Sequence, residues 1–303
     1  MTTESDVKLI PIETPIGKFN VWTKRIGNNP TIKLLLLHGG PGGCHEFFEI
    51  FEQYLPAQDI EFYYYDQLGS YMSDKPTDVS LWTIKRFVDE LEQVRQALQL
   101  NQNNFYLLGH SWGGILAIEY ALKYQHNLKA LIISNMMSSA IAYAEYAENV
   151  LAKQMGAKVY KMIKEFEKNK DYENPTYTEL LMSNFYVEHF CRLKPWPESI
   201  NRAMSHLNQE VYILMQGPSE FGISGLLAKW DRSNDLSKIE VPTLIIGATH
   251  DTMDPEYMKW MSTQMKHGSF LLCPNGSHCS MWDDQSPYFD ELVRFLKKVD
   301  QNN

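Results

Sequence analysis

The sequence predicts an α/β fold in which helices cover both faces of a mostly parallel sheet and a helical lid is inserted into the chain. Short apolar runs bounded by Gly, Asn or Asp recur along the 303 residues, and amphipathic stretches such as residues 83–98 lie between several of them. Strands that alternate with helices are typical of a parallel sheet covered on both faces. The strands expected from the apolar runs are residues 33–37, 61–65, 104–108, 130–134, 243–247 and 269–272.

The alternation of strands and helices is interrupted in the middle of the chain. The alternation stops after Ser134 and resumes at Val241. From Met137 to about Gly225 the sequence becomes rich in Ala, Tyr, Met, Glu and Lys and predicts helices, mainly over residues 140–168 and 178–190. Open parallel sheets bind ligands outside the C-terminal ends of their strands, so a helical insertion at that edge is expected to cover the ligand. The expected domains are a catalytic core of residues 1–137 and 226–303 and a lid of residues 138–225.

Composition and charge exclude several classes of partner. Lys and Arg number 28 against 37 Asp and Glu, a net charge of −9, and no basic tract is present. Nucleic acid and anionic membranes are poor partners for such a surface. No apolar stretch reaches the roughly 18 residues of a membrane-spanning helix, and residues 1–6 lack the basic and apolar regions of a secretion signal. A cytoplasmic protein is expected, and the sequence leaves its oligomeric state open.

The four cysteines predict neither a metal site nor redox chemistry. Cys44, Cys191, Cys273 and Cys279 have spacings that match neither a zinc ribbon nor a CxxC pair. In a long intracellular chain such cysteines are more often buried thiols than disulfide partners. No other grouping of His, Cys, Asp and Glu has the spacing of metal ligands, so no metal and no cofactor are expected.

A GxSxG pattern provides the candidate nucleophile. Gly109-His110-Ser111-Trp112-Gly113 directly follows an expected strand and directly precedes an apolar run. The pattern places the serine on a sharp, strained strand-to-helix turn, where side chains at the flanking glycine positions would collide. Ser111 is therefore the expected nucleophile. The alternative is a helix N-cap serine after a glycine turn.

A nucleophilic serine needs a base and a residue that orients it, and in this topology they follow in the order Ser, acid, His. Asp251 follows the strand expected at residues 243–247, and His278 follows the next one. Both would emerge at the same sheet edge as Ser111, with His250 and Asp254 as the nearest competitors. Taken singly, Asp251 would be read as a turn or cap carboxylate and His278 as a surface loop residue. Their order and shared edge favour a triad.

A glycine-rich loop, His38-Gly39-Gly40-Pro41-Gly42-Gly43, follows the first expected strand of the core. Acyl transfer needs backbone N–H donors aimed at the developing oxyanion, and glycines let the backbone approach without Cβ obstruction. The amide of Trp112 is the expected first donor, and this loop would supply the second. A phosphate-binding loop is the alternative, but the pattern fits neither GxGxxG with its acidic partner nor the Walker A motif.

Five segments occur together over nearly the whole chain, from about Thr14 to Leu296. They are the glycine-rich loop, Asp66-Gln67-Leu68-Gly69-Ser70, the GxSxG segment with Gly114, Gln216-Gly217-Pro218-Ser219-Glu220-Phe221, and His278 followed by Met281-Trp282. Together they resemble the proline iminopeptidase family of α/β-hydrolases. The match is specific, because ordinary esterases of this fold lack the Gly-Pro-Ser-Glu-Phe segment in the lid.

The resemblance implies an α/β-hydrolase fold and a cofactor-free serine aminopeptidase. Such an enzyme hydrolyses, through an acyl-enzyme, the bond after an N-terminal proline or a similar small apolar residue. Its substrate would be a small peptide or aminoacyl amide with a free N-terminus. The site residues that it implies are the triad Ser111, Asp251 and His278, the oxyanion-hole amides of Gly40 and Trp112, and Glu220 at the free α-amine.

Two positions depart from the family pattern. Thr252 stands where a second carboxylate commonly follows the catalytic Asp, and Tyr71 replaces a glycine. Both positions are expected near the substrate, so the aminoacyl preference stays open. For Glu220 the alternative is a solvated lid carboxylate. The alternative functions are an amino-acid amidase or ester hydrolase on the same scaffold, and a catalytically silent hydrolase fold that binds a ligand. The complete set of triad residues weighs against silence.

Overall fold

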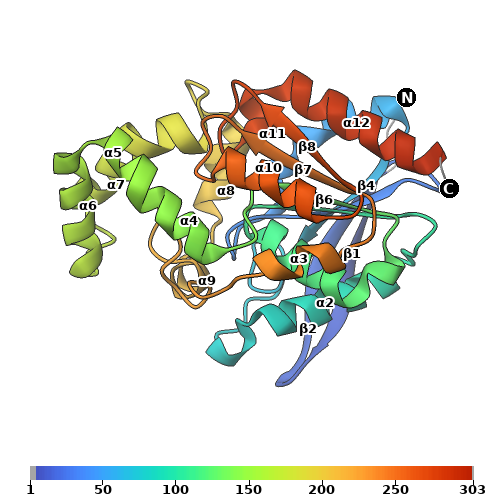
Figure 1. Cartoon of the computed structure of the whole chain (residues 1–303). Coiled ribbons are helices and arrows are strands. Elements are labelled where there is room, and N and C mark those ends of the chain that lie inside the picture. Colours follow the sequence, from blue (N-terminus) through green and yellow to red (C-terminus); the bar gives the residue numbers. More distant parts are fainter. Residues whose placement is uncertain (1–4, 302–303) are drawn as a thin grey trace.

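The computed structural model describes residues 5–301 and is built on one eight-stranded sheet (Figure 1). The strand order is β1-β2-β4-β3-β5-β6-β7-β8. The β1–β2 and β2–β4 pairs are antiparallel and all other neighbours are parallel, which confirms the predicted mostly parallel sheet. The strands are β1 (Ser5–Thr14), β2 (Gly17–Ile26), β3 (Lys33–Leu37), β4 (Glu61–Asp66), β5 (Phe105–His110), β6 (Ala130–Ser134), β7 (Thr243–Ala248) and β8 (Gly268–Cys273).

All six strands expected from apolar runs are present, with ends shifted by at most two residues. β4, β5, β6 and β7 are buried along their whole length, and strands buried on both faces read as continuous apolar runs. The hairpin of β1 and β2 was not expected. Along β1, Val7 and Leu9 are exposed while Ile10 and Ile12 are buried, so this edge strand has no continuous apolar run.

Helices cover both faces of the sheet, as predicted. Leu34 and Leu36 of β3 pack in one apolar cluster with the helices of one face, and Leu35 and Leu37 pack in a second cluster on the other, because side chains alternate along a strand. The helix expected over residues 83–98 begins at its N-cap Thr83. The first cluster includes α1 (Phe51–Tyr54) and α12 (Gln285–Gln301), and the second includes α2 (Ile84–Ala97), α3 (Trp112–Tyr124) and α10 (Pro255–Gln264).

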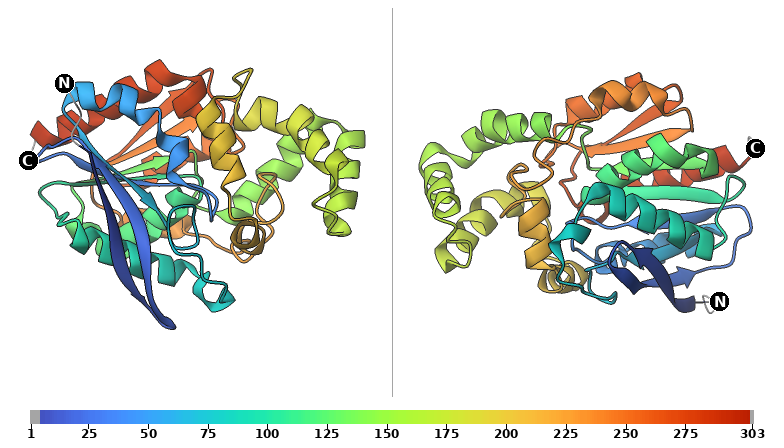
Figure 2. Two further views of the ribbon diagram at one scale, coloured as in Figure 1. Left: turned by 180° about the vertical axis from the view of Figure 1, so that it is seen from behind. Right: turned by 90° about the horizontal axis from the view of Figure 1, so that it is seen from below.

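Between β6 and β7 the chain leaves the sheet and forms a group of helices, which we call the insertion (residues 140–230). Figures 1 and 2 show α4–α7 projecting to one side of the sheet. The two ends of the insertion meet in a β-bridge between Ser139 and Asp231. The division into a core and a lid domain stays a prediction. The insertion contains α4 (Ala140–Tyr146), α5 (Ala152–Met155), α6 (Ala157–Lys168), α7 (Pro175–Leu181), α8 (Glu198–Ser205), α9 (Gln209–Met215) and the π-helical segments η5 (Ala147–Leu151) and η6 (Met182–Phe190).

The shorter elements complete the described part of the chain. None of the helices within residues 5–301 is long and apolar enough to cross a membrane. The expectation that residues 1–6 contain no secretion signal falls partly on residues 1–4, which lie outside the described residues. All four cysteines are free and buried, as expected. The shorter helices are α11 (Ser280–Asp283), η1 (His45–Phe48), η2 (Pro56–Gln58), η3 (Val79–Leu81), η4 (Gln125–Asn127) and η7 (Ser233–Lys238).

Candidate active site

Ser111 lies on the turn between β5 and α3, with φ 56° and ψ −126°. A positive φ is rare for a residue with a side chain and costs about 1–3 kcal/mol, so the surrounding structure must hold it. The neighbouring glycines are sterically required. A Cβ at Gly109 would lie 2.0 Å from the Gly113 carbonyl oxygen, and a Cβ at Gly113 would lie 2.0 Å from that of Leu37. These contacts confirm the predicted steric reason for the GxSxG pattern.

The glycine-rich loop after β3 passes directly beside the serine. A Cβ at Gly39 would lie 3.0 Å from Cβ and 3.4 Å from Oγ of Ser111, and Gly39, Gly40 and Ser111 line one cavity. Two contacts of the His38 ring hold the loop. Its Nδ1 donates to the Gly39 carbonyl at 2.8 Å, and its Nε2 accepts a hydrogen bond from the backbone N–H of Gln67 at 3.1 Å. Burial lowers the pKa of His38, which keeps the ring neutral in this tautomer.

Trp112 is the first residue of α3, directly after the serine. Its indole N–H donates to Oε1 of Gln67 at 2.8 Å, and the ring is buried. The backbone N–H groups of the first helical turn have no acceptor within the helix. The two expected oxyanion donors, the amides of Gly40 and Trp112, therefore belong to backbone segments that adjoin Ser111. Gln67 contacts both segments and so fixes one relative to the other.

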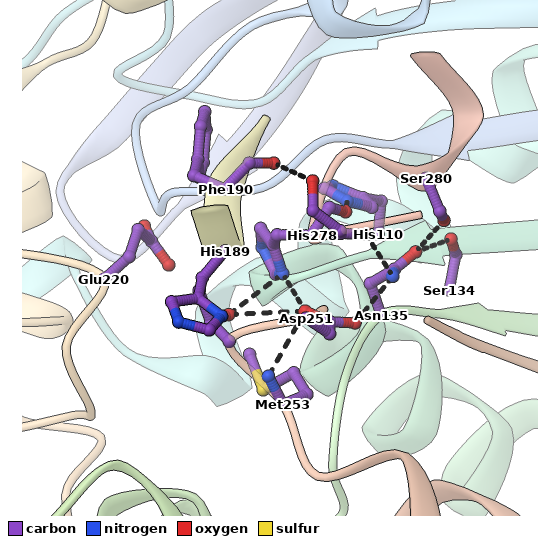
Figure 3. Close-up of polar contacts among 12 residues, drawn as sticks. His110, Ser134, Asn135, His189, Phe190, Glu220, Asp251, Met253, His278 and Ser280 are labelled. Carbon is purple, nitrogen blue, oxygen red and sulfur yellow. Dashed lines mark hydrogen bonds and ion pairs between the residues drawn. The ribbon is translucent and has the colours of Figure 1, made fainter. Parts of the chain in front are cut away.

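Asp251 follows β7 and His278 follows β8, and their side chains form a buried pair (Figure 3). Nδ1 of His278 donates to Oδ1 of Asp251 at 2.8 Å, and each residue is 1% exposed. Because Nδ1 carries the proton, Nε2 of His278 is the ring nitrogen that can accept a proton from the hydroxyl of Ser111. Burial alone would lower the pKa of His278, but the hydrogen bond to Asp251 and the charges of Asp251 and Glu220 raise it above its ordinary value. Ser111 and His278 line the same cavity.

The two competitors for the acid and the base, Asp254 and His250, make other contacts. Asp254 caps α10, where its carboxylate accepts the amide of Glu256 at 2.9 Å. The carbonyl of His250 lies 3.0 Å from Nδ1 of His189. Neither His250 nor Asp254 is among the described residues that line the cavity with Ser111. Asp251 does not line the cavity either, but among these acids and bases it is the one that the structure bonds to Nδ1 of His278, at 2.8 Å.

Asp251 has a second side-chain partner, Asn135, which the sequence analysis missed. Its amide nitrogen donates to Oδ2 of Asp251 at 2.6 Å. Asn135 directly follows β6. Its side-chain oxygen Oδ1 accepts hydrogen bonds from the hydroxyls of Ser134 at 2.8 Å and Ser280 at 2.9 Å (Figure 3). A buried carboxylate needs such partners. The available signal was a polar residue at a C-terminal strand end, but no sequence feature indicated which carboxylate it would contact.

His110, the residue before Ser111, supports the backbone of His278. Its Nε2 donates to the carbonyl of His278 at 2.9 Å, and the two rings lie 4.9 Å apart between centroids. Burial, together with the neighbouring His278, lowers the pKa of His110 to about 3. His110 is therefore neutral at physiological pH and adds no positive charge to the cavity that it helps to line.

The insertion contacts the backbone of His278 as well. The amide of His278 donates to the carbonyl of His189 at 2.8 Å, and the amide of Cys279 donates to the carbonyl of Phe190 at 2.8 Å. His189 and Phe190 are the last residues of η6. Two main-chain hydrogen bonds therefore join the end of an insertion helix to the loop that carries His278.

The two positions that depart from the family pattern do not line the cavity. The hydroxyl of Thr252 lies 3.1 Å from Nδ1 of His278 and 3.4 Å from Oδ1 of Asp251, so hydrogen bonding turns it toward the acid–base pair. The ring of Tyr71 stacks on His206 with centroids 3.7 Å apart. Neither side chain is among the described lining residues, and whether either contacts the substrate stays a prediction.

Glu220 comes from the insertion and lines the cavity together with Ser111 and His278. Its side chain points from the insertion toward His278 (Figure 3). It is 8% exposed, so the alternative of a solvated lid carboxylate is wrong. The hydroxyl of Tyr212 donates to Oε1 at 2.6 Å. Burial raises the pKa of Glu220, and the charge of His278 and the Tyr212 hydrogen bond offset this only in part.

The cavity has a volume of about 330 Å³ and a mainly apolar lining. Aromatic and aliphatic side chains from the insertion form most of its walls, including Tyr177, Leu181, Tyr186 and Ile213, and Phe47 contributes from the core. Ligand sites typically combine such a lining with a few polar groups that fix orientation. This cavity suits an apolar residue with one cationic group directed at Glu220.

One group of side chains could hold a metal ion, although no sequence spacing indicated it. The ligand atoms of Cys44, Glu46 and His206, which we call the Cys44 cluster, lie within 4.8 Å of one another. Glu46 already accepts hydrogen bonds from Arg202 at 2.9 Å and His206 at 2.7 Å. These two bonds outweigh its burial and lower the pKa of Glu46. Both oxygens of Glu46 thus already accept hydrogen bonds, and none of the residues of the Cys44 cluster lines the cavity.

Comparisons with known proteins agree with this geometry. The family model for the alpha/beta hydrolase fold matches residues 33–285. The proline iminopeptidase of Flavobacterium johnsoniae is 59% identical over 291 residues, and that of Elizabethkingia meningoseptica is 58% identical over 294, each match covering 96% of this chain and 98% of the relative. The crystal structure of proline iminopeptidase from Mycobacterium smegmatis superposes with a TM-score of 0.86 at 26% identity, covering 98% of this chain and 99% of that one. The chain therefore belongs to the proline iminopeptidase family of α/β hydrolases.

Proposed function

We propose that the protein is a cofactor-free serine aminopeptidase that releases an N-terminal proline, or a similar small apolar residue, from peptides and aminoacyl amides. The observation that carries this proposal is the position of a buried carboxylate, Glu220, in the same cavity as Ser111 and His278. A hydrolase that needs no free amine has no use for a buried acid there, because an unpaired buried charge is destabilising. The names of the similar proteins support the same activity for this chain.

In the proposed reaction Oγ of Ser111 attacks the carbonyl carbon of the N-terminal residue while Nε2 of His278 accepts the hydroxyl proton. Asp251, 2.8 Å from Nδ1, holds the ring in the required tautomer and stabilises the imidazolium. The amides of Gly40 and Trp112 stabilise the oxyanion. The imidazolium then protonates the leaving amine, and a water activated by His278 hydrolyses the acyl-enzyme. No metal enters any of these steps.

The free α-amine would bind at Glu220. A cationic amine loses hydration in a buried cavity and needs a carboxylate to offset that loss. Tyr212 occupies Oε1, and among residues 5–301 no donor is bonded to Oε2, which leaves that oxygen for the ammonium group. Thr252 supplies no second carboxylate. Glu220 is thus the one buried acid of the described lining, and the bound amine would in turn lower its raised pKa.

The test is a parallel assay of proline, alanine and phenylalanine p-nitroanilides, a proline-containing tripeptide, N-acetylproline p-nitroanilide and a simple acyl ester. We expect cleavage of the free-amine substrates, proline first, and none of the acetylated one. Ser111→Ala should stay folded and lose several orders of magnitude in kcat. Turnover of proline amide without any peptide cleavage, or of the ester alone, would replace the proposal by the amidase or ester hydrolase. Absence of turnover with every substrate would indicate a silent fold.

A further inference from the structure

Asn208 lies at the corner between α8 and α9, where the insertion meets the core. Its backbone N–H donates to the carbonyl of Gly42 in the glycine-rich loop at 2.9 Å. Its side-chain Nδ2 donates to the carbonyl of Gly69 at 2.8 Å. Gly69 belongs to the segment that also contains Gln67, which contacts both the glycine-rich loop and Trp112. One residue of the insertion thus bonds the two core segments on which the expected oxyanion donors depend.

The contact between Asn208 and Gly42 is close enough to transmit a movement to Gly40. A Cβ at Gly42 would lie 2.9 Å from the carbonyl oxygen of Asn208 and 3.1 Å from its Cβ, so the two backbones pack directly against each other. Gly40 and Gly42 belong to one tight turn, since a Cβ at Gly40 would lie 2.8 Å from the amide nitrogen of Gly42. A shift of Asn208 against the core would therefore change the alignment of this turn with the insertion.

Asn208 is also the N-cap of α9, the helix that supports the amine site. Its Oδ1 accepts a backbone N–H of the first turn at 3.3 Å, and its carbonyl accepts the N–H of Tyr212 at 2.9 Å. The hydroxyl of Tyr212 in turn donates to Glu220 at 2.6 Å. Directly after α9, the side chain of Gln216 donates to the carbonyl of Gly222 at 3.0 Å. This bond holds the loop that carries Glu220 at the end of the helix that Asn208 begins.

The proposed reaction needs the amine site and the oxyanion donors at a fixed separation, a requirement that rests on the proposed function. In an N-terminal residue the α-amine and the scissile carbonyl carbon are joined through one Cα, by bonds of about 1.5 Å each. The substrate therefore cannot stretch. With its amine at Glu220, its carbonyl reaches Ser111 only when the insertion and the core are aligned. A misplacement of about 1 Å can lower a rate about 100-fold.

We infer that Asn208 is a positioning residue that aligns the amine site of the insertion with the oxyanion donors of the core. It is not among the described residues that line the cavity, so it acts through α9 and the glycine-rich loop. Loss of its side chain should leave each site intact but misplace one relative to the other. A substrate that occupies both sites should then react more slowly, whereas a probe that occupies one site should be unaffected.

The experiment compares the wild type and Asn208→Ala with one substrate and two probes. Proline p-nitroanilide spans both sites. Phenylmethanesulfonyl fluoride reacts with Ser111 and has no amine, and pyrrolidine is a cyclic amine without a carbonyl that should compete with substrate at Glu220. We expect Asn208→Ala to lower kcat/KM for proline p-nitroanilide about 10- to 100-fold, mainly in kcat because the amine still binds. The inactivation rate constant and the Ki of pyrrolidine should stay within about threefold of the wild type, since neither probe spans the two sites.

Two further variants separate alignment from helix capping. Asn208→Asp keeps an oxygen that can cap α9 but replaces the donor to Gly69 by a carboxylate oxygen. It should also lower kcat for proline p-nitroanilide, because the bond to the core is lost. Asn174→Ala is the matched control. Asn174 caps α7, which also lines the cavity, and its side chain bonds Thr176 and Asp171 within the insertion. Its loss should leave the substrate and both probes unaffected.

The outcomes distinguish the inference from the proposed function. An unchanged kcat/KM in Asn208→Ala or Asn208→Asp, or an equal loss with the substrate and both probes, would overturn the inference and leave the proposed function intact. The same loss of kcat in Asn174→Ala would also overturn it, because capping alone would then explain the effect. A wild type that neither cleaves proline p-nitroanilide nor binds pyrrolidine would overturn both.

Discussion

Replacing Glu220 with glutamine should weaken substrate binding and at the same time stabilise the free protein. Glutamine keeps the shape of the side chain and an acceptor for the Tyr212 hydroxyl, which lies 2.6 Å from Oε1, but it removes the charge. A hydrogen bond to a charged group contributes about 1.5–3 kcal/mol. The KM for proline p-nitroanilide should therefore rise about 10- to 150-fold, while kcat changes less because Glu220 does not bond the triad.

The effect on stability has the opposite sign. Burial raises the pKa of Glu220 in the folded protein above its unfolded value of about 4.3. Below the unfolded pKa the carboxyl is neutral in both states, and the substitution should be nearly neutral. As pH rises through the folded pKa, the charged carboxylate increasingly favours unfolding. Glu220→Gln should therefore have a higher free energy of unfolding than the wild type at pH 8, with the gain lost near pH 4.

Steady-state kinetics and urea unfolding at the two pH values measure both effects. Glu173→Gln is the control, since it removes an exposed lining carboxylate and should change the KM for the nitroanilide less than threefold. A KM for Glu220→Gln within threefold of the wild type would show that the amine is bound elsewhere. A lower free energy of unfolding at pH 8 would refute the raised pKa.

Three further outcomes are expected. The acidic limb of the kcat/KM profile should have an apparent pKa above the ordinary 6.5 of histidine, because the hydrogen bond and charge of Asp251 outweigh the effect of burial on the pKa of His278. Activity needs the neutral ring, so kcat/KM should fall as pH falls through this pKa. An acidic limb with a pKa below 6 would contradict the prediction. Asn135→Ala should lower kcat about tenfold or more with little change in KM. The reason is that Oδ2 of Asp251 loses the amide donor that lies 2.6 Å away, at a cost of about 1–3 kcal/mol. An unchanged kcat would exclude a role of Asn135 in positioning Asp251. Dialysis against EDTA should leave kcat and Tm unchanged, because the Cys44 cluster does not line the cavity; a loss that zinc restores would refute a metal-free mechanism.

The sequence was informative wherever function depends on local position in the chain. Ser111 directly follows β5, Asp251 and His278 lie in the loops after β7 and β8, and the C-terminal ends of parallel strands lie at one edge of the sheet. Asn135 also follows a strand, but an asparagine at a strand end is common in turns, so its position alone carried no functional signal. Which carboxylate it contacts depends on the order of strands in space.

The burial and the hydrogen bonds of Glu220 could not be predicted from the sequence. Its burial results from packing within the insertion, where the Tyr212 hydroxyl bonds its carboxylate and the Tyr143 hydroxyl bonds its backbone carbonyl. No periodicity or spacing encodes these contacts. The same holds for Thr252, whose position beside the catalytic acid suggested a role at the substrate. Its hydroxyl bonds the acid–base pair.

The hydrogen bonds between the end of η6 and the His278 loop constrain how such enzymes diverge. Both acceptors, at His189 and Phe190, are main-chain carbonyls, so substitutions there leave the acceptors in place. A deletion or insertion in η6, by contrast, would shift the register of the carbonyls and leave the amides of His278 and Cys279 unpaired. Homologues should therefore tolerate varied side chains along this stretch but few changes in its length. A chimera that exchanges the insertion between relatives should retain turnover only when the backbone path into these two carbonyls is preserved.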